Sequence, residues 1–451
     1  MNLKTALTTA AGLLIAIGGP ALADDGTQNA SPSSNSAETS QAVNPVATVE
    51  GSGVKVGEAS TLYPVLGVET GFISNVFYED TNPTSAGLLR ILGQIGFGSL
   101  PEQRLTSPSV PESTPLAPLP DHGDVSFRTD IYAAWDQYLS TNDNLQAQGG
   151  LSGGLLVRGV INPNRPFSIA IMEHLQRLTR ATNFESNQDT NREVNNLNIR
   201  FNYQPVGRTV GGYLYYRHTL DFFEDTDQRF ANRLNHTFGL RVQWQWLPLT
   251  RFYGDFSWGV FGGLGSASTK DGAYPLTAVV GATTMLSLDF TLNARVGYAN
   301  GFYSSGPSYS NITGGLQLGY RYSPLGRLLA TYDYSQQDSI NANFYTDHQF
   351  SLAVEQQFVP FVLYVRPEAH LRTYEGISQV VPGIMPSSES RSDVILRLAA
   401  GMRYNFRDWI AATLEYAVTS DQTDFMYTSG GVADDPSYTR HELLVGLKAA
   451  F

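Results

Sequence analysis

Residues 233–246 read RLNHTFGLRVQWQW and alternate two kinds of side chain along their whole length. One set is Leu234, His236, Phe238, Leu240, Val242, Trp244 and Trp246, and the other is Asn235, Thr237, Gly239, Arg241, Gln243 and Gln245. A strand places two such sets on opposite faces, whereas a helix would scatter both around its circumference. The stretches NNLNIRFNY (195–203) and NITGGLQLGYRY (311–322) repeat the pattern. The alternation therefore predicts β-strands with one apolar face.

The length of these runs indicates which kind of sheet they form. The run 233–246 has 14 residues and the run 311–322 has 12. Strands of a soluble sandwich typically have about five or six residues. A strand that crosses a membrane at its usual tilt needs about 9–11 residues, with a margin at each interface. The runs thus favour a transmembrane β-barrel over a soluble sandwich.

A short motif closes several of the predicted strands. It reads aromatic, any residue, aromatic, any residue, Pro, two residues and Arg, as in FNYQPVGR (201–208), WQWLPLTR (244–251) and YRYSPLGR (320–327). Proline suits a tight turn because its missing N–H costs no ladder hydrogen bond there. Aromatic side chains on the lipid-facing side are typical of the headgroup level. The predicted aromatic girdle consists of Tyr203, Trp244, Trp246, Tyr320, Tyr322 and Tyr404.

Long polar segments separate the other strand ends, at 179–192, 373–392 and 419–439. Short turns at one end and long loops at the other are the pattern of bacterial outer-membrane barrels. The fold class expected is all-β, a single transmembrane antiparallel barrel over residues 61–451 with eighteen strands. The count depends most on the hairpin 273–301, whose turn carries no Pro. Without that hairpin sixteen strands would remain.

The N-terminal residues predict export to the cell outer membrane. Lys4 precedes an apolar stretch at 6–19, and Ala21-Leu22-Ala23 fits a signal-peptide cleavage site, so 1–23 is the expected signal peptide. No Cys follows it, which excludes a lipid-anchored lipoprotein. Residues 24–60 are polar and are expected to form a flexible periplasmic tether. The Pro-rich segment 99–123 is expected to be a periplasmic insertion, either a tolerated one or a docking arm for a partner.

The last strand, RHELLVGLKAAF (440–451), carries a second targeting feature. Leu443, Val445, Leu447, Ala449 and Phe451 share one face, and the chain ends on an aromatic residue. This end is similar to the C-terminal signal that outer-membrane barrels present to the barrel-insertion machinery. The matching positions are Gly446, Ala449 and Phe451, and Leu444 stands where that signal usually has a polar residue.

The first predicted hairpin, LGVETGFISNVFYEDTNPTSAGLLR (66–90), contains a Gly-rich strand that runs into Ser-Asn-Val-Phe and a Thr-Asn-Pro turn. It resembles the opening of the β-barrel porin type-two family of outer-membrane proteins. That resemblance implies a link to exopolysaccharide secretion and to periplasmic polysaccharide-export components as partners. It supplies no catalytic residue.

Strand parity predicts a basic lumen near the short turns. The arginines expected to point inward there are Arg158, Arg200, Arg241, Arg251, Arg321, Arg327, Arg366 and Arg403. Inward acidic residues are expected at Asp130, Asp255, Asp333, Glu355, Glu368 and Glu415. The arginines could select anionic solutes by charge. Alternatively, the two sets could form cross-strand ladders that brace the wall.

These features favour a channel for saccharide, exopolysaccharide or other anionic solutes. A general diffusion porin is the first alternative, with 373–392 and 419–439 as candidate constriction loops. A non-transport barrel, either a lipid-acting enzyme or a surface-structural protein, is the second. His370 with Glu368 and Arg372, and the outward His218 and His236, lack a recognisable Ser nucleophile, so no enzyme activity is expected. No metal-binding or phosphate-binding motif is present, so no metal or cofactor is expected, and the net charge of −12 argues against nucleic acid.

Overall fold

The computed structural model describes residues 53–57, 60–99, 124–163, 165–178, 191–205, 207–377, 384–386, 388–429, 432–434 and 436–451. The expected signal peptide, most of the expected tether and the Pro-rich segment after Ser99 lie outside these residues. Within the expected tether, Val54–Val56 form a short strand, β1, that pairs with the first barrel strand.

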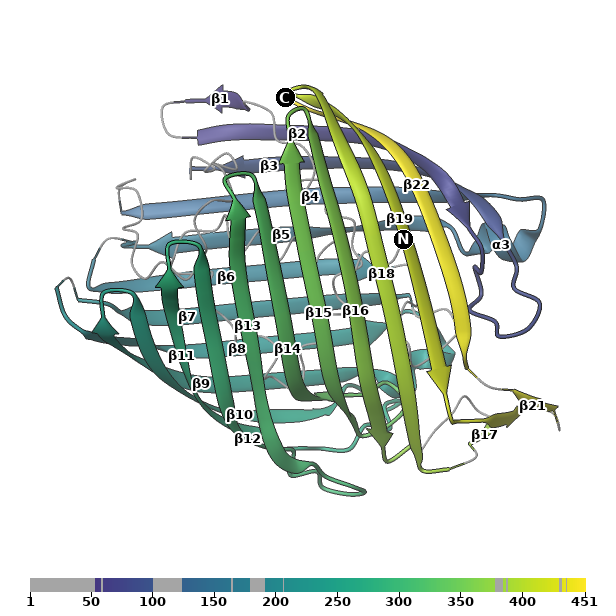
Figure 1. Cartoon of the computed structure of the whole chain (residues 1–451). Coiled ribbons are helices and arrows are strands. Elements are labelled where there is room, and N and C mark those ends of the chain that lie inside the picture. Colours follow the sequence, from purple (N-terminus) through teal and green to yellow (C-terminus); the bar gives the residue numbers. More distant parts are fainter. Residues whose placement is uncertain are drawn as a thin grey trace.

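Eighteen long antiparallel strands form one closed barrel (Figure 1). They are β2 (Ser60–Ile73), β3 (Ala86–Gly98), β4 (Val125–Leu139), β5 (Gly150–Ile161), β6 (Phe167–Leu178), β7 (Arg192–Tyr203), β8 (Val210–Phe223), β9 (Arg233–Leu247), β10 (Thr250–Gly263), β11 (Leu276–Ser287), β12 (Phe290–Asn300), β13 (Ser310–Ser323), β14 (Gly326–Asp338), β15 (Phe344–Phe358), β16 (Phe361–Glu375), β18 (Ser390–Arg407), β19 (Ile410–Thr423) and β22 (Tyr438–Ala450). The last strand closes the barrel on the first, with Val65 opposite Ala450 and Ile73 opposite Glu442. The predicted fold and the count of eighteen are confirmed, and the hairpin β11–β12 is part of the wall.

The two ends of the barrel differ in how the strands are joined. Two-residue turns connect β9 to β10, β11 to β12, β13 to β14, β15 to β16 and β18 to β19, for example Pro248-Leu249 and Pro324-Leu325. We call this the short-turn end. At the opposite end, the loop end, the connections include the helix α3 (Asp143–Ala147), the 3-10 helix η3 (Thr226–Ala231) and a small sheet of β17 (Ile384–Pro386), β20 (Tyr427–Ser429) and β21 (Val432–Asp434).

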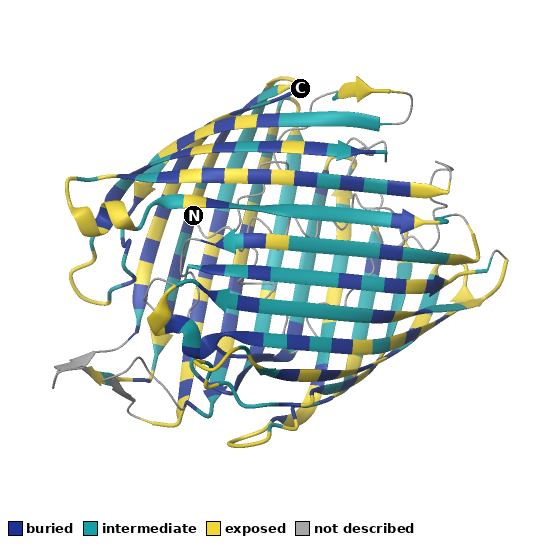
Figure 2. Ribbon diagram, turned by 180° about the vertical axis from the view of Figure 1, so that it is seen from behind, coloured by how far each residue is buried: buried dark blue, intermediate teal, exposed yellow. Residues whose placement is uncertain are grey.

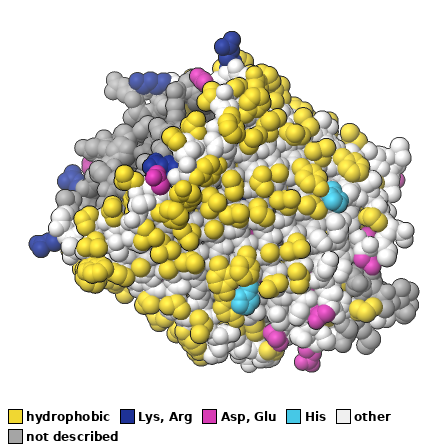
Figure 3. All heavy atoms as spheres, in the orientation of Figure 1, with side chains coloured by type: hydrophobic (Ala, Val, Ile, Leu, Met, Phe, Trp, Pro, Cys, Tyr) yellow, Lys and Arg dark blue, Asp and Glu magenta, His cyan; other side chains and the backbone are white. Residues whose placement is uncertain are grey.

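The strand faces alternate as the sequence predicts. Figure 2 shows buried and exposed residues alternating as bands along many strands. The outward residues are large and apolar, with Ile131 58% exposed and Val280 63% exposed. Figure 3 shows hydrophobic side chains spread over the face built by β13 to β19 and β22. An apolar outer surface around a closed barrel is the arrangement that lipid requires.

Two element boundaries differ from the prediction. The fourth predicted strand, 147–161, was expected to begin at residue 147, but β5 begins at Gly150 because α3 precedes it, with the Asn142 side chain accepting from the Asn144 N–H as its N-cap. The sixteenth was expected to end at 404, but β18 continues to Arg407. Among the described residues, no helix is both long and apolar enough to cross a membrane.

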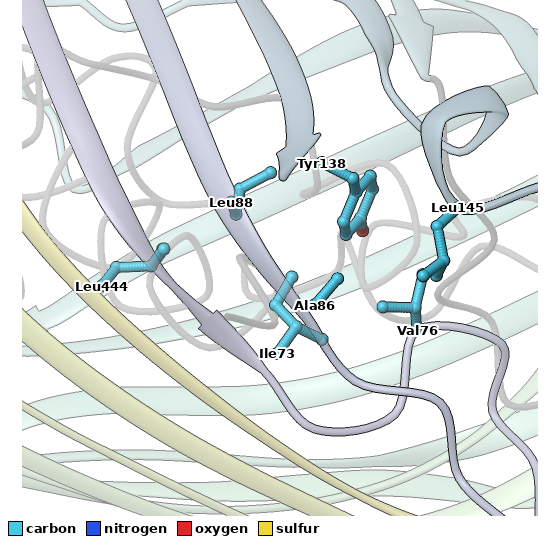
Figure 4. Packing of buried hydrophobic residues seen from close by; sticks show 7 residues of the cluster. All are labelled: Ile73, Val76, Ala86, Leu88, Tyr138, Leu145 and Leu444. Carbon is cyan, nitrogen blue, oxygen red and sulfur yellow. The ribbon is translucent and has the colours of Figure 1, made fainter. Parts of the chain in front are cut away.

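An apolar cluster covers part of the inner wall near the loop end (Figure 4). It joins Ile73, Leu88, Tyr138 and Leu145 with Leu444 of the last strand, and Leu444 is 3% exposed. The cluster gives a physical reason for the departure from the C-terminal signal. A polar side chain at position 444 would be buried among apolar groups, at a cost in desolvation.

Candidate functional site: the inner wall of the barrel

The inner wall divides into two halves by distance from the turns. The short-turn half comprises inward residues up to about six positions from the short-turn end of their strand, and the loop half comprises the others. Strand alternation places all eight predicted arginines on the inner wall in the short-turn half. Arg200, Arg241 and Arg366 are buried, whereas Arg158, Arg251, Arg321, Arg327 and Arg403 are partly exposed.

Three of these arginines have carboxylate partners. Arg327 donates to Glu355 across β14 and β15 at 2.9 Å. Arg321 donates to Asp289 of the neighbouring turn at 2.9 Å. Arg158 lies 3.8 Å from Asp130, which accepts more closely from Arg128 at 2.8 Å. Ladder formation, the bracing alternative, thus applies to part of the arginine set.

Other arginines stack on tyrosine rings. Arg241 lies 3.8 Å from the ring centre of Tyr253, Arg366 lies 4.2 Å from that of Tyr364 and Arg200 lies 5.0 Å from that of Tyr213. A guanidinium over an aromatic face is attracted by the ring quadrupole and keeps its full charge. The stacks therefore hold these arginines against the wall.

Glycine makes room for two of the tyrosines. Tyr253 lies directly opposite Gly281, and Tyr364 lies directly opposite Gly401. A Cβ added to either glycine would come within 3.0 Å of the tyrosine ring. The ring therefore lies flat across the neighbouring strand, and the arginine covers its other face. Each unit is a Gly–Tyr–Arg stack that spans neighbouring strands of the wall.

The loop half contains many ion pairs between buried side chains. Arg90 donates to Asp136 at 2.6 Å and approaches Glu69 at 3.4 Å. Asp221 accepts from Arg233 at 2.8 Å and from Arg192 at 3.4 Å. Further pairs join Arg391 to Asp393 and Arg440 to Glu442, each at 2.7 Å.

The largest cluster of the loop half is centred on His370. Its Nδ1 lies 2.9 Å from Asp347 and its Nε2 lies 3.1 Å from Glu368. Arg372 donates to Asp347 at 2.9 Å, and Arg397 donates to Glu368 at 3.3 Å. Sequence analysis grouped His370 with Glu368 and Arg372 but missed Asp347 and Arg397, because these come from β15 and β18 and only strand register reveals them.

The two halves differ in their balance of charge. Basic residues of the short-turn half are Arg128, Arg158, Arg200, Arg241, Arg251, Arg295, Arg321, Arg327, Arg366, Arg403 and Lys448, and acidic ones are Asp130, Asp255, Glu355 and Glu415, with Asp289 in a turn. Basic residues of the loop half are Arg90, Arg192, Arg217, Arg233, Arg372, Arg391, Arg397 and Arg440, and acidic ones are Glu69, Asp136, Asp221, Asp333, Asp347, Glu368, Asp393, Asp421 and Glu442. Basic side chains thus predominate near the short turns and the two signs are nearly matched near the loops, and two ion pairs, Lys448–Glu69 at 2.9 Å and Arg295–Asp333, join the two halves.

The short connection between β14 and β15 contacts several distant segments at the loop end. Ser339 and Ile340 are fully buried between β14 and β15, and Ile340 packs with Phe223 and Phe230 of the β8–β9 region. Arg233 donates to the Ser339 carbonyl at 2.9 Å, and Lys270 donates to the same carbonyl at 2.8 Å. Segments distant along the chain are therefore tied together around residues 339–343.

Tyr303 extends this packing. Its hydroxyl donates to Asp338 at 2.9 Å, and burial beside that carboxylate raises the pKa of Tyr303 well above its ordinary value.

The candidate constriction loops were 373–392 and 419–439. The described strands of these loops form the small sheet of β17, β20 and β21, which Figure 1 shows beyond the ends of the barrel strands.

The predicted girdle residues face outward near the short turns. Trp244, Trp246 and Tyr203 are 48%, 55% and 45% exposed. Tyr320 stacks on Phe290 at 4.5 Å, and Tyr404 contacts Phe361 at 4.8 Å. Tyr322 is 40% exposed and lies 6.4 Å from Tyr320.

The residues of the predicted assembly signal are divided between the two faces of β22. Phe451 is 53% exposed and stacks on Trp409 at 5.7 Å, and Ala449 lies opposite Ile410. Gly446 points inward, where a Cβ would come within 3.0 Å of Glu69 and Thr413. Recognition by the insertion machinery stays a prediction.

No family model matches the chain, and no curated protein matches it. Several solved structures are similar to the chain. One is OpdK of Pseudomonas aeruginosa with vanillate, which has 10% identity and a TM-score of 0.45, with 86% of this chain and 99% of that chain covered. OccAB4 of Acinetobacter baumannii has 10% identity and a TM-score of 0.45, with 87% and 99% covered. OccK2 (OpdF) of Pseudomonas aeruginosa in complex with glucuronate has 12% identity and a TM-score of 0.43, with 87% and 98% covered. The chain itself is a closed eighteen-strand antiparallel barrel of the outer-membrane type.

Proposed function

We propose that the barrel is a channel for small anionic solutes, with the short-turn half of its inner wall as the selective region. The observation that carries this proposal is the predominance of basic side chains there, against near balance in the loop half. A wall of one sign concentrates counter-charged solutes and raises their rate of entry.

The arginines divide into two roles under this proposal. Arg251, Arg327 and Arg403 are partly exposed, and because a guanidinium has five donors, each can donate to a solute carboxylate, Arg327 beside its partner Glu355. Arg200, Arg241 and Arg366 are buried in tyrosine stacks and contribute charge to the wall without direct contact. Solute selection is therefore expected to depend most on the exposed group.

Solute flux through the refolded full chain in vesicles tests the proposal. Glucuronate and glucose form a matched pair of probes because they differ by a carboxylate. Glucuronate is expected to enter several-fold faster than glucose. In the triple variant Arg251→Gln, Arg327→Gln, Arg403→Gln this preference is expected to disappear, while the matched triple Arg→Lys variant retains most of it.

Other outcomes would separate the alternatives. Equal entry of the two sugars, unchanged in the glutamine variant, would contradict the proposal and favour a general diffusion porin. A channel for anionic solutes could also pass a longer anionic polymer, an exopolysaccharide. The support for such export is the resemblance of residues 66–90 to the β-barrel porin type-two family. An anionic oligosaccharide that blocks the channel from the short-turn side would favour that version and a periplasmic export partner.

A further inference from the structure

Three tyrosine–histidine pairs on the outer surface share one geometry. Tyr216 bonds His236 at 2.8 Å, Tyr332 bonds His348 at 3.0 Å and Tyr416 bonds His441 at 2.8 Å, always through Nδ1. In each pair the tyrosine lies directly opposite the residue two positions after the histidine, which is Phe238, Phe350 or Leu443. The histidines follow the outer start of their strands by three or four residues, roughly 10–13 Å along the strand.

This geometry determines which ring nitrogen faces the membrane. When the Tyr416 hydroxyl donates to Nδ1, the neutral ring of His441 carries its proton on Nε2. Nε2 is then a hydrogen-bond donor on the exposed outer surface. Such donors at the headgroup level suit an anionic lipid group.

The second and third pairs differ from the first because they lie at a groove: Tyr332 of the second pair lines it, and His441 of the third lies opposite the lining residue Val418. A cavity of about 640 Å³ crosses the outer surface from β13 to β19. Ala330, Pro367 and Ala369 contribute small outward side chains to its lining, and Leu316 and Leu396 contribute large ones. Near Pro367 the β15–β16 register has a gap between the pairs Ser351–Glu368 and Val354–Val365, since proline lacks an N–H.

The groove leads to a polar cluster at its β19 side. Val418 and Ser420 line the groove, and they lie directly opposite His441 and Thr439 of β22. Thr439 donates to Ser420 at 3.3 Å, beside the Tyr416–His441 pair. An apolar groove therefore meets a group of hydroxyls and a ring nitrogen on the same lipid-facing surface.

We propose that this surface binds an acylated lipid with a phosphate headgroup: an acyl chain lies in the groove and the phosphate accepts from His441 and its hydroxyl neighbours. The occupant is amphiphilic because the groove itself is apolar, whereas the hydroxyls and the His441 ring lie beside its β19 side. A second copy of the chain would instead bring another apolar barrel surface against the exposed hydroxyls and leave them desolvated.

Native mass spectrometry of the refolded full chain, extracted from phosphatidylcholine vesicles with increasing phosphatidic acid, tests this site. The variant His441→Leu removes the headgroup donor, and Ala369→Phe fills the groove. Each is expected to raise at least five-fold the phosphatidic acid fraction at half-saturation. The control His236→Leu removes a histidine with the same tyrosine contact, which also lies 3.5 Å from His218 and has no groove beside it, and it is expected to stay within two-fold of the parent chain. Diacylglycerol, which lacks the phosphate, is expected to bind at least five-fold more weakly.

Two results would overturn the proposal. Equal losses in the His441 and His236 variants would indicate a general interfacial girdle without a lipid site. Disulfide cross-linking of two copies through Ala369→Cys, with unchanged phosphatidic acid binding in Ala369→Phe, would indicate that the groove is a contact between copies. Folding of every variant is verified by its cooperative thermal transition in phosphatidylcholine alone.

Discussion

The two halves of the inner wall use arginine in different ways. In the loop half, arginines are paired with buried carboxylates, as in the cluster around His370. In the short-turn half, several stack on tyrosines, as Arg241 does on Tyr253, whereas a loop-half arginine such as Arg372 stacks on Tyr345 and also pairs with Asp347. A carboxylate partner cancels the field of an arginine, whereas a tyrosine ring fixes its position and leaves the field in place. The loop half therefore contains nearly matched charges, and the short-turn half contains an excess of basic side chains.

The largest effect is expected from breaking the loop-half cluster. Asp347→Asn removes the negative charge that both His370 and Arg372 contact, and the side chains of these two residues are each 1% exposed. An uncompensated buried charge costs about 3–5 kcal/mol. The free energy of unfolding, measured by urea titration in lipid, is expected to fall by that amount. A loss below about 1 kcal/mol would show that water reaches these groups and that the half is not braced by them.

An intermediate effect is expected from disturbing one Gly–Tyr–Arg stack. Gly281→Ala places a methyl group against the Tyr253 ring and lifts it from the neighbouring strand. Overpacking of this kind costs about 1–3 kcal/mol in the free energy of unfolding. Gly254→Ala on β10 is the matched control, because an added Cβ there has no atom within 4 Å. Equal stability of the two variants would contradict the stacked arrangement.

A small effect on stability is expected at the short-turn end. Arg321 and Asp289 form a pair whose side chains are 27% and 53% exposed. Such pairs contribute about 0.2–1 kcal/mol, so Arg321→Gln is expected to lower the free energy of unfolding by no more than that. The contrast with Asp347→Asn sharpens the distinction between the halves. If both variants lost the same stability, the distinction between bracing and charge would fail.

Much of the fold was predictable because strand alternation and turn chemistry are local signals. The eighteen strands followed from runs such as 233–246 and from short turns such as Pro324-Leu325. The start of β5 was missed because α3 depends on a cap at Asn142, which period-two alternation does not report.

The sequence predicted which side chains of the wall point inward, but not which residues they contact. Alternation alone placed Arg241 on the inner face, yet its stack on Tyr253 depends on the register of β10 with two neighbouring strands. The sequence does carry one signal for these stacks, an inward glycine such as Gly281 opposite a tyrosine, but it becomes readable only when strand register is known. The same reason explains why Asp347 was not grouped with His370.

We propose that the excess of basic side chains in the short-turn half makes the channel prefer anions. The most direct test is the reversal potential of the full chain in a planar bilayer under a potassium chloride gradient at low ionic strength, where screening is weakest. We expect the sign of the reversal potential to show that chloride is more permeant than potassium. In the triple variant Arg251→Gln, Arg327→Gln, Arg403→Gln we expect the reversal potential to move toward zero. A channel that prefers potassium, or one whose selectivity is unchanged by removing these charges, would contradict it.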